Sequence, residues 1–179
     1  MRYAAVLALA VSVGPLMLPA KAPVPRPTAD FVCTDQNGKP IALSGYKGKV
    51  VVVQFLITTC SHCQEFSRML TKFQAEFGPK GFQAIGVAFN DADAAMVKSY
   101  VENHRIGIRV GFAPRDAVLG YLGVPLMDQR LTVPQVVIID RSGQVRAQTD
   151  VAGTRELVDE PYLRTLIGHL LASPAGHAK

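Results

Sequence analysis

The 179-residue chain has no tryptophan, only three cysteines and no long run of like charge. Secreted proteins that depend on disulfides for stability carry many cysteines, so the count argues against a disulfide scaffold. The net charge is +5, and the basic residues are scattered except for the small group Lys39, Lys47 and Lys49. No aromatic stripe is interleaved with them, so we expect no nucleic-acid partner. Apolar residues make up 49% of the chain, which is enough to form the core of one domain.

The first 22 residues have the three parts of a secretory signal peptide. Arg2 gives a positive start, residues 4–18 form an apolar run, and Ala20-Lys21-Ala22 resembles a cleavage site. The run is shorter than the ~20 residues that span a membrane, and an uncleaved membrane anchor is the alternative. We therefore expect an exported protein with a signal peptide over residues 1–22, a proline-rich linker over 23–27, a domain over 28–172 and a flexible tail over 173–179.

Two of the cysteines form the motif Cys60-Ser61-His62-Cys63, which follows the apolar run of residues 50–57 and precedes an amphipathic run over 65–77. A disulfide that closes so short a loop adds little stability, so we interpret the pair as a redox dithiol. If Cys60 lies at the start of a helix, free N–H groups and the helix dipole favour its thiolate. The motif therefore predicts Cys60 as the nucleophile and Cys63 as the more buried resolving thiol.

His62 lies between the two cysteines, where a charged imidazole would stabilise the Cys60 thiolate further. A more stable reduced form makes a dithiol a stronger oxidant. The alternative is that His62 is exposed and only weakly coupled to the sulfur. Cys33 is expected to be a small buried apolar residue, with a role as a second resolving cysteine as the alternative.

Periodicity and turn residues predict an α/β fold with a mixed sheet covered by helices on both faces. The Asn37-Gly38 pair indicates a type I′ hairpin turn. Asn90 is expected to cap a helix that has Asp91 and Asp93 in its first turn. The expected strands are residues 30–35, 40–43, 50–56, 82–89, 108–112, 135–140 and 145–149, and the expected helices are 60–77, 90–104, 116–122 and 157–171.

Several phrases of the sequence, in this order and spacing, resemble the TlpA/ResA/DsbE group of exported thioredoxin-like proteins, whose domain family (AhpC/TSA and Redoxin) also includes the peroxiredoxins. The resemblance implies a thioredoxin fold with an N-terminal β-hairpin and a central strand–helix insert. It covers about residues 28–172. The matching phrases are Asp30-Phe31, Asp35-Gln36-Asn37-Gly38-Lys39, Leu43-Ser44, Lys47-Gly48-Lys49-Val50, the Cys60–Cys63 motif, Val133-Pro134 and Ile139-Asp140-Arg141-Ser142-Gly143.

This resemblance implies thiol–disulfide exchange without a cofactor or a metal. The substrates would be thiols or disulfides of exported proteins, and the place the bacterial periplasm or cell envelope, with a membrane anchor if the signal is not cleaved. A membrane protein would donate or accept the electrons, and the enzyme would be a monomer. Kinship with TlpA and ResA suggests a reductase, whereas His62 and Val133 are similar to residues of the oxidant DsbA.

The resemblance also implies roles for residues outside the dithiol. Pro134 would follow a cis peptide bond and, with Thr59 and Val133, would contact the substrate. Asp91 matches an acidic residue that lies near the dithiol in ResA-like proteins and could accept the proton of the resolving thiol. The alternative for Asp91 is a helix first-turn residue beside Asn90.

The chain departs from the family pattern at three places. Thr59 replaces the usual tryptophan before the first cysteine, Gln54 replaces a buried Asp or Asn, and residues 125–132 lengthen the link before Val133; we expect this longer link to border the substrate groove. Two other functions on this fold are a thiol peroxidase and a copper-binding chaperone. The peroxidase pattern P-x-x-x-T-x-x-C and the copper pattern C-x-x-x-C are both absent.

Overall fold

Strand β4 (Val50–Leu56) lies in the middle of the sheet, and all seven of its residues are buried. It pairs in parallel with β5 (Phe82–Ala88) and antiparallel with β7 (Gln135–Ile139). A strand that is paired on both sides and covered on both faces needs apolar side chains in both directions. The continuous apolar run therefore predicted this position correctly.

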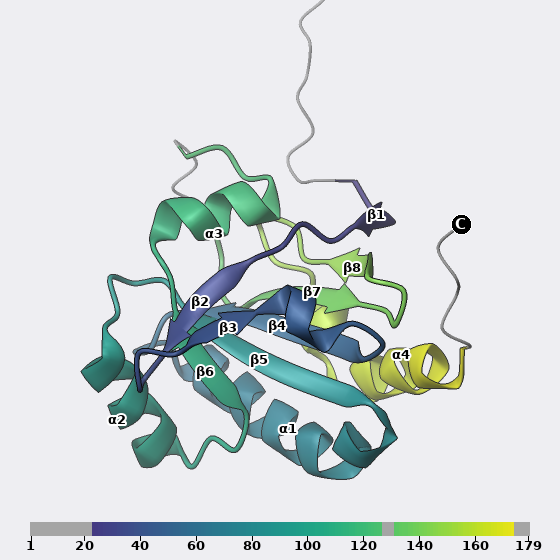
Figure 1. The fold of residues 1–179 in the computed structure, drawn as a ribbon, viewed down its shortest axis with the longest axis horizontal. Coiled ribbons are helices and arrows are strands. Elements are labelled where there is room, and N and C mark those ends of the chain that lie inside the picture. The colour runs from purple at the N-terminus through teal and green to yellow at the C-terminus, as the bar shows by residue number, and fades with distance from the viewer. Residues whose placement is uncertain (1–22, 127–130, 174–179) are drawn as a thin grey trace, which may run out of the picture.

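The computed structural model describes residues 23–126 and 131–173 (Figure 1). Its eight-stranded mixed sheet has the order β1-β8-β7-β4-β5-β6-β2-β3. The expected signal segment, residues 1–22, lies outside the described residues, as do 127–130 of the longer link and 174–179 of the tail. The other elements are β1 (Arg26–Pro27), β2 (Val32–Asp35), β3 (Pro40–Ala42), α1 (Ser61–Phe77), α2 (Ala94–His104), β6 (Arg109–Phe112), α3 (Arg115–Leu122), β8 (Gln144–Gln148) and α4 (Glu160–Ala172).

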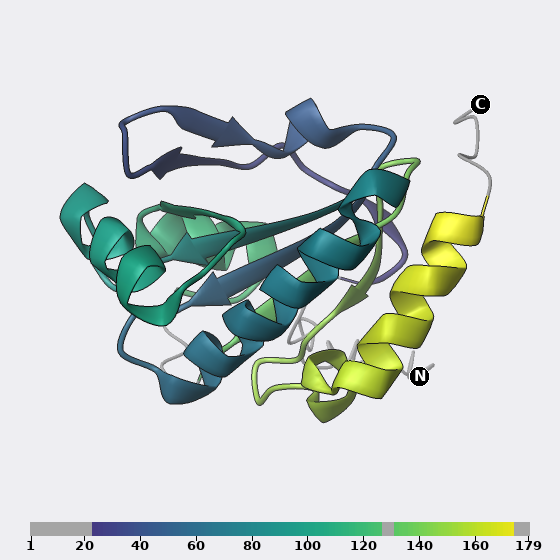
Figure 2. The same cartoon turned by 90° about the horizontal axis from the view of Figure 1, so that it is seen from below.

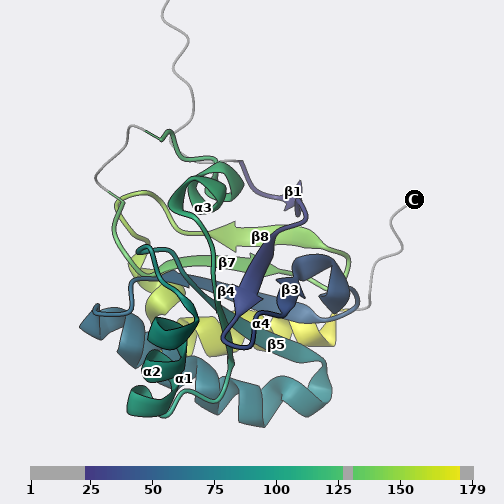
Figure 3. The same cartoon turned by 60° about the vertical axis from the view of Figure 1, so that its left-hand side comes forward.

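Two cores lie on opposite faces of this sheet, because successive side chains of a strand point to opposite sides. Val50, Val52 and Leu56 belong to the core under α1, α2 and α4. Val51 and Val53 belong to the core under α3 and the β2–β3 hairpin. Figures 1 and 3 show α3 on one side of the sheet and α1 and α4 on the other, and Figure 2 shows the hairpin away from α1. The predicted α/β class with helices on both faces is confirmed.

The β2–β3 hairpin forms as expected, but its turn is not of type I′. That type needs positive φ at both central residues, whereas only Gly38 has it, with φ 75°. The Asp35 carboxylate accepts hydrogen bonds from the backbone N–H groups of Asn37 (2.8 Å) and Lys39 (2.9 Å), which stabilise a longer turn. The side chain of an Asp at the start of a turn commonly does this.

Helix α2 begins later than the sequence suggested. Asp93 is its N-cap and accepts a hydrogen bond from Met96 N–H at 2.8 Å, so Asp91 and Asp93 both precede the helix. Asn90 instead binds Thr58: its Oδ1 accepts from Thr58 N–H (3.2 Å) and its Nδ2 donates to Thr58 Oγ1 (3.0 Å). This pair joins the turn after β5 to the turn that precedes the dithiol.

The expected linker is partly a strand. Within residues 23–27, Arg26 and Pro27 form β1 and pair with Val145 and Gln144 of β8. The Arg26 guanidinium also donates to Gln148 Oε1 at 2.9 Å, so the edge of the sheet begins earlier than predicted. None of the helices in the described part of the chain is long and apolar enough to cross a membrane.

Candidate redox site

Cys60 lies where the chain leaves β4 and enters α1. It is the N-cap of the helix, with an extended backbone, and its Sγ accepts a hydrogen bond from Cys63 N–H at 3.3 Å. The sulfur therefore takes the place that a Ser or Asp oxygen usually has at a helix start. The Cys60 sulfur thus lies at the N-terminal end of α1, the end that carries the positive pole of the helix dipole.

Cys63 is fully buried, whereas Cys60 is partly exposed. Burial raises the pKa of the Cys63 thiol well above its usual range, and the hydrogen bond with Cys60 and the charge of Cys60 raise it further. A hydrogen bond from the backbone at Ile57 acts in the opposite direction. One sulfur is thus accessible at a helix start, and the other is protected and protonated behind it.

Three buried polar side chains form a cluster at the carbonyl group of Cys63, on the face of the sheet that α1 covers. Gln54 of β4 donates from Nε2 to the Cys63 carbonyl oxygen at 2.8 Å. Ser67 of α1 donates to Gln54 Oε1 at 2.6 Å, and its hydroxyl lies 2.7 Å from that of Tyr100 on α2. In the sequence, Gln54 stands out only as a replacement for a buried Asp or Asn. Ser67, a polar residue on the apolar face of α1 one turn after Cys63, is the other feature of the sequence that could have indicated this cluster.

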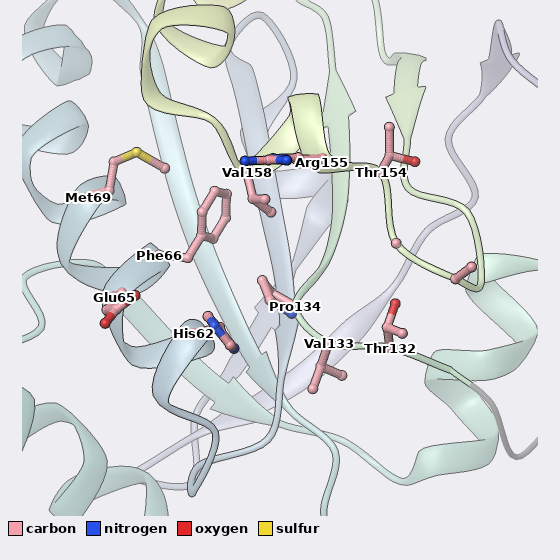
Figure 4. A pocket seen from close by; sticks show the side chains of 12 residues that line it. His62, Glu65, Phe66, Met69, Thr132, Val133, Pro134, Thr154, Arg155 and Val158 are labelled. Carbon is pink, nitrogen blue, oxygen red and sulfur yellow. The ribbon is translucent and has the colours of Figure 1, made fainter.

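A groove of about 410 Å³ lies beside the motif, between α1, the segment before β7 and the segment after β8 (Figure 4). The Val133–Pro134 peptide bond that borders it is cis, as expected. Thr132, at the end of the longer link, also lines the groove, whereas Thr59 is exposed and does not. The lining residues are His62, Glu65, Phe66, Met69, Thr132, Val133, Pro134, Ala152, Gly153, Thr154, Arg155 and Val158.

The AhpC/TSA family profile matches residues 24–148, which include the dithiol, the groove's Pro134 and every strand of the sheet. The chain belongs to the AhpC/TSA family. Thiol-disulfide oxidoreductase ResA of Bacillus anthracis is 29% identical over 147 residues, which cover 82% of this chain and 80% of that protein. A thioredoxin-family thiol:disulfide interchange protein from Chlorobium tepidum is 25% identical, with a TM-score of 0.66 over 84% of this chain and 99% of its own.

A thiol:disulfide interchange protein from Bacteroides sp. is 22% identical, with a TM-score of 0.65 over 86% of this chain and 94% of its own, and that likeness shows the fold. The fold is the thioredoxin fold, with the N-terminal hairpin and the strand–helix insert that the sequence predicted. This member of the AhpC/TSA family is a thiol–disulfide oxidoreductase. The peroxidase pattern of other members is absent before each cysteine.

Asp91 is not brought into contact with the dithiol. It is exposed, with a left-handed backbone (φ 52°). In the described part of the chain, no hydrogen bond or ion pair joins its carboxylate to either sulfur. A role in proton transfer for Asp91 therefore stays a prediction. The described residues also contain no group of three or more His, Cys, Asp or Glu side chains that could hold a metal ion.

Cys33 lies in the other core, on the face of the sheet opposite Cys63. Only 3% of its surface is exposed. Burial raises the pKa of Cys33 to about 12, against a smaller opposite effect of the Arg109 charge. Its position agrees with the expected role of a small apolar core residue and separates it from the dithiol.

The buried thiols make the reduced protein sensitive to alkali. Above about pH 9, thiols of the unfolded chain release protons that Cys33 and Cys63 keep in the folded protein, because both folded pKa values are raised. The contribution of these thiols to the free energy of unfolding is fully present below that pH. It is lost as the pH rises, by about 1.4 kcal/mol per pH unit for each thiol. Urea unfolding at neutral and alkaline pH with a reductant present measures this slope.

Two matched samples serve as controls for that slope. The oxidised protein lacks the Cys63 thiol, and Cys33→Ala lacks the other, so each should lose stability less steeply than the reduced parent protein. An unchanged free energy of unfolding up to pH 10 would contradict the burial of both groups.

Proposed function

We propose that this protein exchanges disulfides with thiols or disulfides of exported proteins in the bacterial cell envelope, with Cys60 as the nucleophile. The observation that carries the proposal is the pairing of a partly exposed Cys60 sulfur at the start of α1 with a fully buried Cys63, which donates its backbone N–H to that sulfur at 3.3 Å. The signal-like residues 1–22 support export, and a membrane protein is the proposed electron donor or acceptor.

The chemistry follows from the two positions. The Cys60 thiolate attacks one sulfur of a substrate disulfide, which forms a mixed disulfide and releases one substrate thiolate. Cys63 then loses its proton and attacks the Cys60 sulfur. The Cys60–Cys63 disulfide forms, the second substrate thiolate leaves, and two electrons have passed to the substrate. The same steps in reverse oxidise a substrate dithiol.

The equilibrium reduction potential against glutathione tests the proposal and decides the direction of electron flow. A value near about −250 mV or lower makes the protein a reductase, and one near about −150 mV makes it an oxidant. If His62 stabilises the Cys60 thiolate, His62→Ala should lower the potential by about 30 mV. A dithiol that does not equilibrate with glutathione at all would refute the proposal.

The groove is the proposed contact surface for the polypeptide around the substrate cysteine. Phe66, Met69 and Val158 give it an apolar lining next to His62 and Pro134. Met69→Lys should therefore raise the KM for a disulfide-containing peptide about tenfold, while the reaction with a small aromatic disulfide should stay within a factor of two or so. Steady-state kinetics with both substrates checks this.

Met96→Lys is the matched control for this substitution. Met96 lies on α2, outside the groove, and 37% of its surface is exposed. We expect it to change neither KM nor the small-disulfide rate. Equal effects of the two lysines would show that added charge, rather than the groove, determines the outcome.

A further inference from the structure

The buried polar side chains around Cys63 form a closed hydrogen-bond network from three different elements. The Cys63 carbonyl oxygen accepts from Gln54 Nε2 at 2.8 Å and from the Tyr100 hydroxyl at 3.3 Å. Gln54 and Ser67 are fully buried, and 3% of Tyr100 is exposed. Burying a polar group costs free energy unless the group is hydrogen-bonded. The bonds of this network therefore hold its three side chains in fixed positions.

The hydrogens of this network have one consistent arrangement. Ser67 has a single hydroxyl hydrogen, which it donates to Gln54 Oε1 at 2.6 Å. Tyr100 must therefore be the donor in its 2.7 Å contact with Ser67, and its single hydrogen is shared with the Cys63 carbonyl oxygen, 3.3 Å away, in a bifurcated bond. Removing one hydroxyl leaves the next group without its partner, so the three side chains act as a unit.

Both backbone groups of Cys63 are thus occupied. Its N–H donates to Cys60 Sγ at 3.3 Å, and its carbonyl oxygen is held by Gln54 and Tyr100. Once Cys60 is bonded to a substrate sulfur, it no longer carries the negative charge that strengthens the first of these bonds. The bonds to the carbonyl oxygen do not depend on that charge, so they still help to fix this residue.

We propose that Gln54, Ser67 and Tyr100 are positioning residues, which hold Cys63 in line for its attack on the mixed disulfide at Cys60. The inference rests on the proposed function and concerns its second step only. A nucleophile that is held close to its target and correctly oriented reacts faster than one that is free to move. The positioning role also gives the strand–helix insert a function, because Tyr100 reaches the dithiol from α2.

Burial keeps the Tyr100 hydroxyl protonated, and so a hydrogen-bond donor, at neutral pH. Burial raises the pKa of Tyr100 to about 12, and the charges of Cys63 and Cys60 act in the same direction. The hydrogen bond with Ser67 and, more weakly, the charge of Arg68 lower it. His104, also on α2, packs edge-on against the ring of Tyr100, with centroids 5.3 Å apart. The hydroxyl therefore stays protonated while the two thiols react.

The reaction with dithiobis-nitrobenzoate, a small aromatic disulfide, separates the two steps in stopped-flow absorbance. Cys60 attacks first and releases one thionitrobenzoate, and Cys63 then displaces the second as the Cys60–Cys63 disulfide forms. Tyr100→Phe and Ser67→Ala should each slow the second release about fivefold and move its pH profile to higher pH, with the first release unchanged. The double variant should be no slower than the slower single variant, because the groups act as a unit.

Tyr121→Phe is the matched control. It removes another buried tyrosine hydroxyl, bonded to Thr28 at 2.9 Å, from the core on the opposite face of the sheet. It should change neither release. A second release as fast as in the parent protein, with an unshifted pH profile, in folded Tyr100→Phe and Ser67→Ala would overturn the positioning role, as would equal slowing by Tyr121→Phe. Absence of the second release from the parent protein itself would instead refute the proposed function.

Discussion

Replacing Cys63 with serine is expected to leave the protein covalently joined to its substrate through Cys60. The accessible sulfur at the start of α1 can still attack a disulfide, but a serine hydroxyl cannot attack the resulting mixed disulfide. Turnover should fall by about a thousandfold or more, while the first step proceeds. Cys60→Ser should abolish both steps, because the buried Cys63 sulfur has no access to a protein substrate.

Non-reducing gels and mass spectrometry of cells that produce the variant check this result. Cys63→Ser should give adducts that a reductant releases, and these should disappear when Cys60 is also replaced. Cys33→Ala is the control: Cys33 lies in the opposite core, so turnover should stay near that of the parent protein. Adducts that depend on Cys33 would contradict the assignment of roles.

Gly111→Ala is expected to destabilise the protein strongly. Gly111 of β6 is paired with Asp35 of β2, and a Cβ there would lie 2.7 Å from Cys33 Sγ and 2.8 Å from the backbone oxygen of Thr34. Backbone cannot give way as a side chain does, so the strands would have to separate. We expect a loss of about 3 kcal/mol in the free energy of unfolding, at the upper end for overpacking.

Gly168→Ala is the matched control for that substitution. Gly168 lies in α4, and nothing is within 4 Å of the Cβ it would gain. Alanine is a better helix former than glycine, so stability should rise by about 0.5–1 kcal/mol. Urea unfolding of the two variants beside the parent protein measures both changes. A Gly111→Ala protein as stable as the parent would show that β2 and β6 are not closely packed.

The fold and the dithiol could be predicted because their signals are local. The apolar run of β4 and the helical periodicity after Cys60 depend on neighbours in the sequence, and the motif lies between them. Contacts that depend on the assembled sheet could not be predicted in this way. Asn90 has the side chain of a typical helix cap, yet it binds Thr58, because the parallel pairing of β4 and β5 brings the two turns together.

The same reason applies to the residues around Cys63. Ser67 and Tyr100 lie 33 positions apart, and only the packing of α2 beside α1 makes their hydroxyls neighbours. The prediction of a type I′ hairpin turn was wrong for a different reason. Asn-Gly favours a two-residue turn, but the Asp35 carboxylate binds two backbone N–H groups and stabilises a longer one.

The alternation of side chains along β4 has a consequence for how substitutions combine. Val52 and Val53 are adjacent in the chain, yet they contribute to different cores. Their effects on stability should therefore be nearly additive, whereas residues far apart in sequence that touch in one core, such as Phe55 and Tyr121 with ring centroids 5.7 Å apart, should show coupling. The two halves of this protein's interior can thus change independently of each other, even at neighbouring positions of one strand.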